Sequence, residues 1–296
     1  MILIRKYIYN VYINLILRTL IWPLKNLLPE KFKIPVNGII KVNLEDKKIY
    51  FTANETSPML RELYWNYYNC NFEFSEIFIE IVKSSKVFFD IGANIGYYSL
   101  ISTKANPNVK VFSFEPSNGP FHFLEKNIEL NMAKNVKALK IAVTDHNDDI
   151  EFYEDINPKY KYQKYHVSGT GNTANTWNNN HTNKYLVSGI RIDDLVIKEK
   201  LDSLDLIKID TEGTEDKVLI GALNAIKKFQ PIIICEVLPN KIESEILDIV
   251  LELNYLIYHH IEEFNKLEKV EKFDASSNRN FIFVPNSKIQ LISKFI

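Results

Sequence analysis

The chain has 296 residues, of which 46% are hydrophobic and 25% are charged, as is typical of a folded globular protein. Its 36 basic and 37 acidic residues leave a formal net charge of −1, without the basic excess of proteins that bind nucleic acid through many phosphates. Two cysteines cannot build a disulfide framework. The composition therefore predicts a cytoplasmic protein that has no nucleic-acid partner.

The first thirty residues are rich in Ile, Leu and Tyr, with Arg and Lys interspersed. Their longest uncharged run, from Tyr7 to Leu17, is shorter than the ~20 residues of a membrane span and contains Asn10 and Asn14. No small-residue cleavage site of a signal peptide follows it. We favour a helix that packs on its own domain or on a second subunit. The alternative is peripheral contact with a membrane surface through residues 1–28.

The sequence of residues 31–85 predicts both strands and helices. Gly38–Leu44 alternates like a strand, and after a turn Ile49–Thr52 has the pattern of a return strand. Two helical patterns follow, at Leu60–Tyr68 and Phe74–Val82. Because no linker rich in Pro or Gly/Ser separates these elements from the rest, we expect an extension of helix, β-hairpin and helix rather than a separate domain.

The most informative region begins with the short apolar run Val87–Asp90, which is typical of a buried parallel strand and ends in an acid. A glycine turn, Ile91–Gly96, leads into a helical pattern, and such a turn lets a ligand approach the backbone closely. The second strand, Val109–Glu115, also ends in an acid. A carboxylate at this strand tip can accept both hydroxyl protons of a ribose, so the region predicts a nucleoside site.

The turn does not have the dinucleotide fingerprint, because Asn94 stands where the middle glycine would admit a pyrophosphate. Asp90, directly before the turn, would repel a phosphate and favour a cationic group such as an amino acid ammonium. S-adenosylmethionine has a ribose, an amino acid tail and a sulfonium but no phosphate. The residues therefore favour S-adenosylmethionine over the NAD of an oxidoreductase.

The remaining pattern completes an α/β fold: a doubly wound, Rossmann-like sheet, mostly parallel, with an antiparallel terminal strand. The two final strands have no helical pattern between them and are expected to pair as a hairpin. The predicted strands after Glu115 are Val136–Asp145 with its exit, Leu204–Gly213, Pro231–Glu236, Tyr255–His259 and Asn280–Pro285.

Several of these segments together resemble the FkbM family of S-adenosylmethionine-dependent methyltransferases, in the order of that family and over roughly residues 72–285. The resemblance implies a class I methyltransferase domain over 72–296, preceded by the extension 1–71, and O-methylation of glycan sugars or of polyketide-type natural products. The segments are Val87–Ser99, Phe114–Pro116, Ile207–Glu215, Val218–Ala222 and Pro231–Glu236.

The resemblance also implies roles for single residues. Glu115 would hold the ribose hydroxyls, and the exit from Ala142 to Asp145 would border the adenine. The cofactor loop would be formed by Asp90, Gly92, Asn94 and Gly96.

An acceptor hydroxyl needs a general base, or a metal that lowers its pKa, before it attacks the methyl carbon in line. Asp210 and Glu212 follow the fourth strand and Glu236 ends the fifth, so all three are expected at the ligand crevice. We favour Asp210 or Glu212 as base with Glu236 as its partner. The histidines His146 and His166 remain alternatives.

Three clustered carboxylates can also bind Mg²⁺ or Ca²⁺, so a divalent metal remains the alternative to a metal-free base, and we assign no metal ligand. Glu215 begins the next helix and is expected to stabilise its first turn. The segment 151–190 lacks a periodic pattern and is rich in Tyr, Asn and Thr, with Trp177. It is either an acceptor lid or a flexible insert.

The sequence thus predicts an S-adenosylmethionine-dependent O-methyltransferase that uses a carboxylate base on a sugar hydroxyl of a glycan or surface polysaccharide. The alternatives are a polyketide-type acceptor or a non-catalytic scaffold that only binds S-adenosylmethionine. A nucleic-acid amino methyltransferase is disfavoured because Asp210-Thr-Glu-Gly stands where that class has a Pro-Pro motif. The sequence indicates neither the acceptor's identity nor an oligomeric state.

Overall fold

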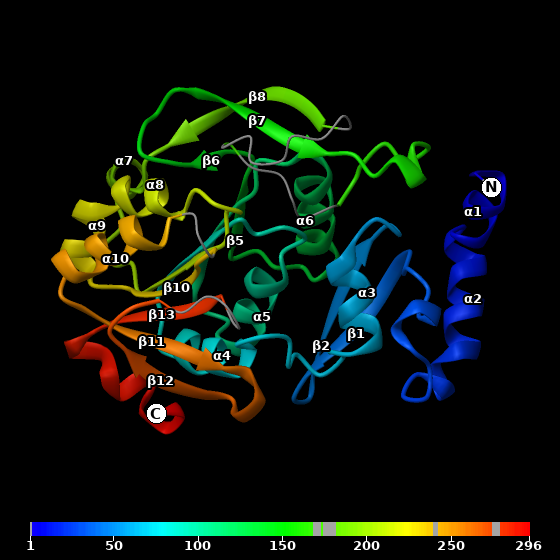
Figure 1. Cartoon of the computed structure of the whole chain (residues 1–296), viewed down its shortest axis with the longest axis horizontal. Coiled ribbons are helices and arrows are strands. Elements are labelled where there is room, and N and C mark those ends of the chain that lie inside the picture. The colour runs from blue at the N-terminus through cyan, green and yellow to red at the C-terminus, as the bar shows by residue number, and fades with distance from the viewer. Residues whose placement is uncertain (1, 168–172, 174–181, 239–241, 274–278) are drawn as a thin grey trace.

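The computed structural model describes residues 2–167, 173, 182–238, 242–273 and 279–296 (Figure 1). Within these residues an eight-stranded sheet crosses the molecule in the order β12-β11-β13-β10-β9-β3-β4-β5. The five strands from β10 to β5 in this order are parallel, as predicted. The strands are β3 (Val87–Ile91), β4 (Lys110–Phe114), β5 (Val136–Leu139), β9 (Leu206–Ile209), β10 (Ile232–Glu236), β11 (Tyr255–Ile261), β12 (Lys266–Val270) and β13 (Asn280–Pro285).

Helices cover both faces of the sheet, which confirms the doubly wound prediction (Figure 1). Successive side chains of a strand point to opposite faces of the sheet, so Phe88 and Phe89 belong to two different apolar clusters. A strand that is buried on both faces therefore has a continuous apolar sequence. One face carries α4 (Ser75–Lys83), α5 (Tyr97–Ala105) and α6 (Asn118–Leu130); the other carries α7 (Ile192–Lys198), α8 (Glu215–Ile220), α9 (Leu223–Phe229) and α10 (Glu243–Glu252).

The antiparallel end of the sheet is larger than predicted. β11 and β13 pair antiparallel, from Tyr255 opposite Pro285, and β13 runs antiparallel to β10, as the sequence indicates. The prediction omitted β12, which lies outside β11 as an edge strand. Of its five residues only Leu267 is buried, so the strand has no alternating apolar pattern to reveal it. Charged residues on such an edge discourage pairing with another chain.

The N-terminal extension shares the core of the main domain rather than forming a separate body. Its hairpin packs on α6, where two asparagine side chains bond to the backbone of the second strand. The Asn127 Oδ1 accepts from Thr52 N–H (2.7 Å), and the Asn131 amide donates to Tyr50 O (2.6 Å). The extension contains α1 (Ile2–Ile8), α2 (Val11–Ile21), β1 (Gly38–Leu44), β2 (Lys47–Ala53) and α3 (Pro58–Trp65).

The segment 151–190 is not a structureless insert at its ends. β7 (Asp149–Asp155) and β8 (Thr182–Ile190) form an antiparallel pair, and the short β6 (Ala142–Val143) lies parallel to β8. Most residues of β8 are exposed or half-buried, so the period-two signal of a strand with one buried face is missing. Trp177, a main reason to expect a lid, lies outside the described residues.

Candidate active site

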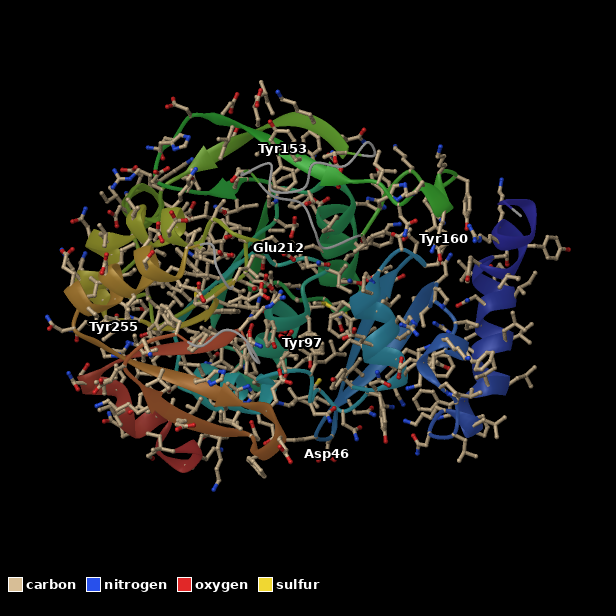
Figure 2. All side chains as sticks on the ribbon, viewed as in Figure 1. Asp46, Tyr97, Tyr153, Tyr160, Glu212 and Tyr255 are labelled. Carbon is tan, nitrogen blue, oxygen red and sulfur yellow. The ribbon has the colours of Figure 1, made fainter. Side chains whose placement is uncertain are left out.

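A cavity of about 340 Å³ opens at the carboxyl ends of β3, β4 and β9, the position expected for a ligand in a doubly wound sheet. Glu212 and Tyr97, two of its lining residues, lie near the middle of the molecule (Figure 2). A smaller cavity of about 170 Å³ adjoins it and extends toward β10. Both cavities are lined by Glu73, Lys208, Asp210 and Glu212.

The predicted glycine turn lines the larger cavity and is held between two strands. The N–H groups of Gly92 and Ala93 both donate to Phe114 O, at 3.0 and 2.9 Å. Gly92 has a φ of +74°, and a Cβ there would lie 1.8 Å from Asp210 O. Only glycine fits this position, because the turn approaches the β9 backbone too closely for any side chain.

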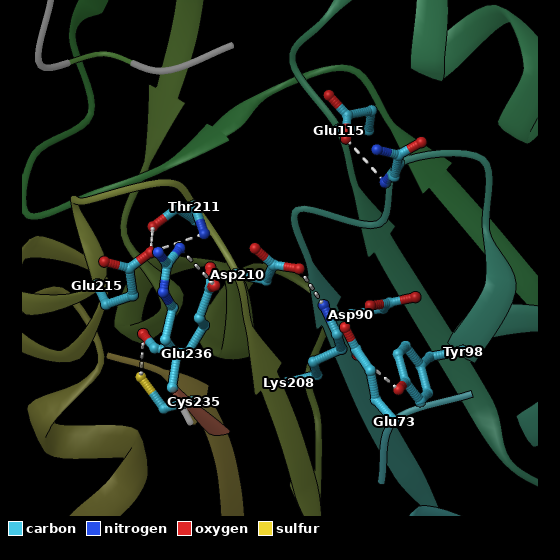
Figure 3. Close-up of polar contacts among 12 residues, drawn as sticks. Glu73, Asp90, Tyr98, Glu115, Lys208, Asp210, Thr211, Glu215, Cys235 and Glu236 are labelled. Carbon is cyan, nitrogen blue, oxygen red and sulfur yellow. Dashed lines mark hydrogen bonds and ion pairs between the residues drawn. The ribbon is translucent and has the colours of Figure 1, made fainter. Parts of the chain in front are cut away.

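Glu115 lines the cavity at the tip of β4 and is only 6% exposed. One carboxylate oxygen accepts from Asn94 N–H at 2.8 Å (Figure 3), and the other accepts from Ser117 N–H at 2.9 Å. Burial raises the pKa of Glu115 to about 7, although these two backbone donors act in the opposite direction. The two backbone bonds fix the carboxylate while each oxygen keeps a lone pair for a ligand hydroxyl.

Lys208, on β9, is a functional candidate that the sequence analysis missed. It is 5% exposed, and its Nζ lies 3.0 Å from Asp210 Oδ2 (Figure 3). Desolvation lowers its pKa, but the negative charges of Asp210, Asp90 and Glu73 outweigh it and hold the pKa above the ordinary value. A buried cation is stable only when it is paired. A lone lysine inside the apolar strand Leu206–Ile209 was the available signal.

Asp90 lies close to this lysine but, within the described part of the chain, does not line either cavity. Its Oδ2 accepts a hydrogen bond from Ser99 Oγ at 2.5 Å, and its Oδ1 has no hydrogen-bond partner among the described residues. Burial raises the pKa of Asp90, while the charge of Lys208 lowers it. Its influence on a ligand in this conformation is therefore through charge rather than through contact.

Glu73 is the second residue that the sequence analysis did not single out. It lies just before α4, lines both cavities and accepts a hydrogen bond from Tyr98 Oη at 3.1 Å. Partial desolvation and the charge of Asp210 raise its pKa, while Lys208 lowers it. Glu73 comes from a helix-flanking turn far from the strand ends in sequence, so no motif spacing could place it here.

Glu236 lines only the smaller cavity, at the end of β10. Burial and the charges of Asp210 and Glu212 raise its pKa well above its usual range, and these effects outweigh the Arg279 guanidinium, which lies 3.8 Å away. The raised pKa favours the protonated form of Glu236, and a side-chain hydrogen bond with Asp210 contributes to the shift. Glu236 is thus brought to Asp210, as expected for its partner.

Glu215 holds the turn after β9, although it was expected to stabilise the first turn of the helix that follows. The Glu215 carboxylate accepts from Thr211 N–H at 2.8 Å (Figure 3) and from Gly213 N–H at 3.1 Å, and both donors precede α8. Between these donors, Glu212 has a φ of +60°, a conformation that costs a residue with a side chain some strain. Glu215 therefore fixes the loop that carries Glu212 into the cavity.

Ala142 also lines the larger cavity, together with Phe152 of β7 and Thr173. Among the described residues, Gly96 and Asp145 do not line it. Gly96 caps the start of α5, and the Asp145 carboxylate lies 2.6 Å from His146 Nδ1. Within the same ranges, no group of three or more His, Cys, Asp or Glu side chains has the geometry to hold a metal ion.

Comparison with known proteins gives a family match over residues 90–260, to a model described as the methyltransferase FkbM domain. The hexuronic acid methyltransferase AglP of Haloferax volcanii is 28% identical over 159 residues, which are 53% of this chain and 59% of that protein. The 2-O-methyltransferase NoeI of Sinorhizobium fredii is 25% identical over 155 residues, 49% of this chain and 61% of that protein.

A third relative, the 31-O-demethyl-FK506 methyltransferase FkbM of Streptomyces tacrolimicus, is 26% identical over 166 residues, 49% of this chain and 62% of that protein. The chain thus spans about three fifths of the length of these relatives. A solved structure of methyltransferase FkbM from Methylobacillus flagellatus KT is 17% identical and covers 67% of this chain and 43% of that chain, with a TM-score of 0.43.

Proposed function

This chain belongs to the FkbM family of methyltransferases, and we propose that it is an S-adenosylmethionine-dependent O-methyltransferase whose acceptor is a sugar hydroxyl. The observation that carries the proposal is Glu115, a buried carboxylate fixed by two backbone N–H groups at the tip of β4 and facing the cavity. Such a group accepts hydrogen bonds from the two hydroxyls of a ribose.

The rest of the cavity fits the same ligand. Gly92 and Asn94 form the turn beside Glu115, and Ala142 lines the part toward β6. Among its described lining residues Lys208 is the one Lys or Arg, and Asp210, Glu212 and Glu73 outnumber it. An excess of negative charge suits a sulfonium and an ammonium and opposes a pyrophosphate. In this proposal Asp90, behind the cavity, adds to that field.

When bound, S-adenosylmethionine supplies a methyl group on a positively charged sulfur. The acceptor oxygen attacks the methyl carbon in line, and the sulfur is the leaving group. The chain's own contribution is to orient the acceptor and to accept its proton. We assign the base to Asp210, because its carboxylate lies at the boundary of the two cavities and the ammonium of Lys208 fixes its position. Glu212, on the same boundary, is the second candidate.

Glu236 supports this assignment as a positioning residue. The raised pKa of Glu236 favours its protonated form, in which the carboxyl can donate a hydrogen bond to an oxygen of Asp210. Two groups thus hold one carboxylate, Lys208 on one side and Glu236 on the other. No step in this proposal needs a divalent metal.

The smaller cavity and the relatives both support a sugar as the acceptor. The lining of this cavity is mostly polar and includes Glu73, Glu236 and Asn280, whose oxygens and amide can bond to the many hydroxyls of a sugar. One relative is named a hexuronic acid methyltransferase, which fits a sugar-type acceptor, and another is named a 2-O-methyltransferase, which fits transfer to an oxygen. A third is named for FK506, so a polyketide-type acceptor is the second candidate.

The test is methyl transfer from S-adenosylmethionine with a labelled methyl group. Panels of uronic acids, neutral oligosaccharides and hydroxylated macrolides serve as acceptors, and the labelled product is identified by mass spectrometry. We expect label on a sugar oxygen. Label on a macrolide alone would show that the acceptor is of the polyketide type and would leave the proposed O-methylation unchanged. Binding of S-adenosylhomocysteine without transfer to any acceptor would favour the non-catalytic scaffold.

A further inference from the structure

Helix α2 packs on the protein through its polar side. Asn14 and Arg18, one turn apart, are 0% and 3% exposed. The Asn14 amide donates to Pro35 O at 3.0 Å and its Oδ1 accepts from Asn37 N–H at 2.9 Å. The Arg18 guanidinium donates to Ile39 O at 2.6 Å. These bonds tie the helix to the chain just before and within β1 and fix which side faces outward.

The opposite side of the helix and the turns that follow it are apolar and unprotected. We call Tyr12, Leu15, Ile16, Leu20, Leu24 and Leu27 the outer apolar face; their exposed fractions lie between 47% and 81%. Nine of the 19 exposed large hydrophobic residues in the described part of the chain lie between residues 7 and 32. Such a concentration marks an interaction surface rather than the scattered apolar residues of an ordinary surface.

The position of the face leaves room for an extended partner. α1 and α2 run along the outer edge of the molecule, with the β1–β2 hairpin between them and the eight-stranded sheet (Figure 1). The loop at Tyr160 lies beside α1, where its ring is 5.8 Å from that of Tyr9 (Figure 2). The described helices include none long and apolar enough to cross a bilayer.

The positive charge of this region favours a negatively charged partner. Residues 1–29 contain no Asp or Glu, and because Arg18 is buried against β1, the cations that a partner can meet are Arg5, Lys6 and Lys25. If a second copy covered the outer apolar face, two positively charged segments would meet, which is unfavourable. A surface with negative headgroups would instead attract them. A helix with an apolar side, flanking Lys and Arg and exposed Tyr is of the kind that lies in the plane of a membrane interface.

We propose that α1 and α2 hold the protein on the surface of a lipid bilayer with anionic headgroups, with the outer apolar face inserted among the lipids. Asn14 and Arg18 then act as the internal anchors that keep this face directed toward the bilayer. Arg18 Nε and Nη1 have no hydrogen-bond partner among the described residues, although the guanidinium carbon lies 5.0 Å from the centre of the Tyr64 ring. Burying this side chain therefore costs free energy, which insertion of the opposite face among lipids would offset in this proposal.

The test uses the full chain and sedimentation with phosphatidylcholine vesicles, with and without phosphatidylserine. We expect binding to the anionic vesicles that weakens as salt rises and is much weaker for neutral vesicles. The double variant Ile16→Glu/Leu20→Glu should bind at least ~10-fold more weakly, because two inserted apolar side chains are lost. The matched control Ile197→Glu/Leu251→Glu changes two exposed residues of α7 and α10 and should bind like the wild type.

Thermal unfolding of both double variants checks that they remain folded, which we expect because all four residues are exposed. Equal sedimentation of the wild type and the α2 variant would overturn the proposal. So would equal binding to neutral and anionic vesicles. If the wild type is a dimer that does not bind vesicles, and Ile16→Glu/Leu20→Glu converts it to a monomer, the outer apolar face binds a second copy of the chain instead. None of these readouts depends on methyl transfer.

Discussion

The ammonium of Lys208, on β9, lies 3.0 Å from the carboxylate of Asp210, which directly follows that strand, and both line the cavity at the strand's end. The end of β9 thus brings the two side chains together. The ammonium is buried, while the carboxylate remains 39% exposed and accessible to a ligand. The pair therefore combines a fixed position with an available oxygen, which is what a general base requires.

Removing the cation should destabilise the fold. Lys208→Met leaves Asp90 and Asp210 without their counter-charge, and we expect a loss of ~2–3 kcal/mol in the free energy of unfolding, less than for a fully buried pair because Asp210 is partly exposed. The measurement is urea unfolding. Lys227→Met, which breaks an exposed pair with Glu252, should cost under ~1 kcal/mol. Equal losses in the two variants would contradict a buried structural role for Lys208.

Removing the proposed base should reduce turnover and leave the fold intact. Asp210→Asn keeps the shape but cannot accept the proton, so kcat should fall ~10²–10⁴-fold. The affinity for S-adenosylhomocysteine should change far less, and titration calorimetry measures it separately. Asp202→Asn, an exposed change before β9, is the control. Full activity in Asp210→Asn, with loss in Glu212→Gln, would move the role of base to Glu212.

The affinity for S-adenosylhomocysteine should depend on pH through Glu115. Its pKa in the free protein is about 7, and the carboxylate form accepts two ribose hydroxyls whereas the acid form loses an acceptor. Affinity should therefore be full above about pH 7 and fall as the pH drops below it, by up to ~10-fold per unit. Calorimetry over this range tests it. Glu115→Gln should bind weakly with a flat profile; an unchanged slope in that variant would assign the titration elsewhere.

The glycine turn should tolerate no side chain at position 92. Gly92→Ala would put a Cβ 1.8 Å from a backbone oxygen at a positive φ, so a loss above ~3 kcal/mol is expected. Gly96→Ala meets only the end of the flexible Leu124 side chain, at 2.6 Å, and should cost ~1–2 kcal/mol. Thermal or urea unfolding ranks the two. A smaller loss of stability for Gly92→Ala than for Gly96→Ala would show that the turn does not approach the backbone oxygen of Asp210 this closely.

Local patterns were sufficient for the parallel half of the sheet and for the positions of Gly92, Glu115 and Asp210. Strand ends of this kind are adjacent in space whenever the strands are parallel, so their order along the chain predicts a shared site. The same reasoning could not find Glu73, because its approach to Asp210 depends on how α4 packs. Nor could it find β12, since an edge strand with one buried residue has no apolar period.

Asp90 shows a different limit. Its place before the glycine turn was read correctly, yet sequence cannot tell whether a side chain at a strand end faces the cavity or the interior. Here Asp90 is 1% exposed and bonds to Ser99, while Lys208 on the neighbouring strand lines the cavity. The register between β3 and β9 sets Asp90 opposite Lys208. That register is a property of the folded sheet.

Calorimetric titration of the full chain with S-adenosylhomocysteine tests whether Glu115 holds the ribose of S-adenosylmethionine. We expect binding that weakens ~10–100-fold in Glu115→Gln, from the loss of ~1.5–3 kcal/mol of charged hydrogen bonds, and that is unchanged in the exposed control Glu125→Gln. NAD should not bind. Binding of NAD alone, or equal affinity for S-adenosylhomocysteine in Glu115→Gln and the wild type, would show that Glu115 does not hold the ribose.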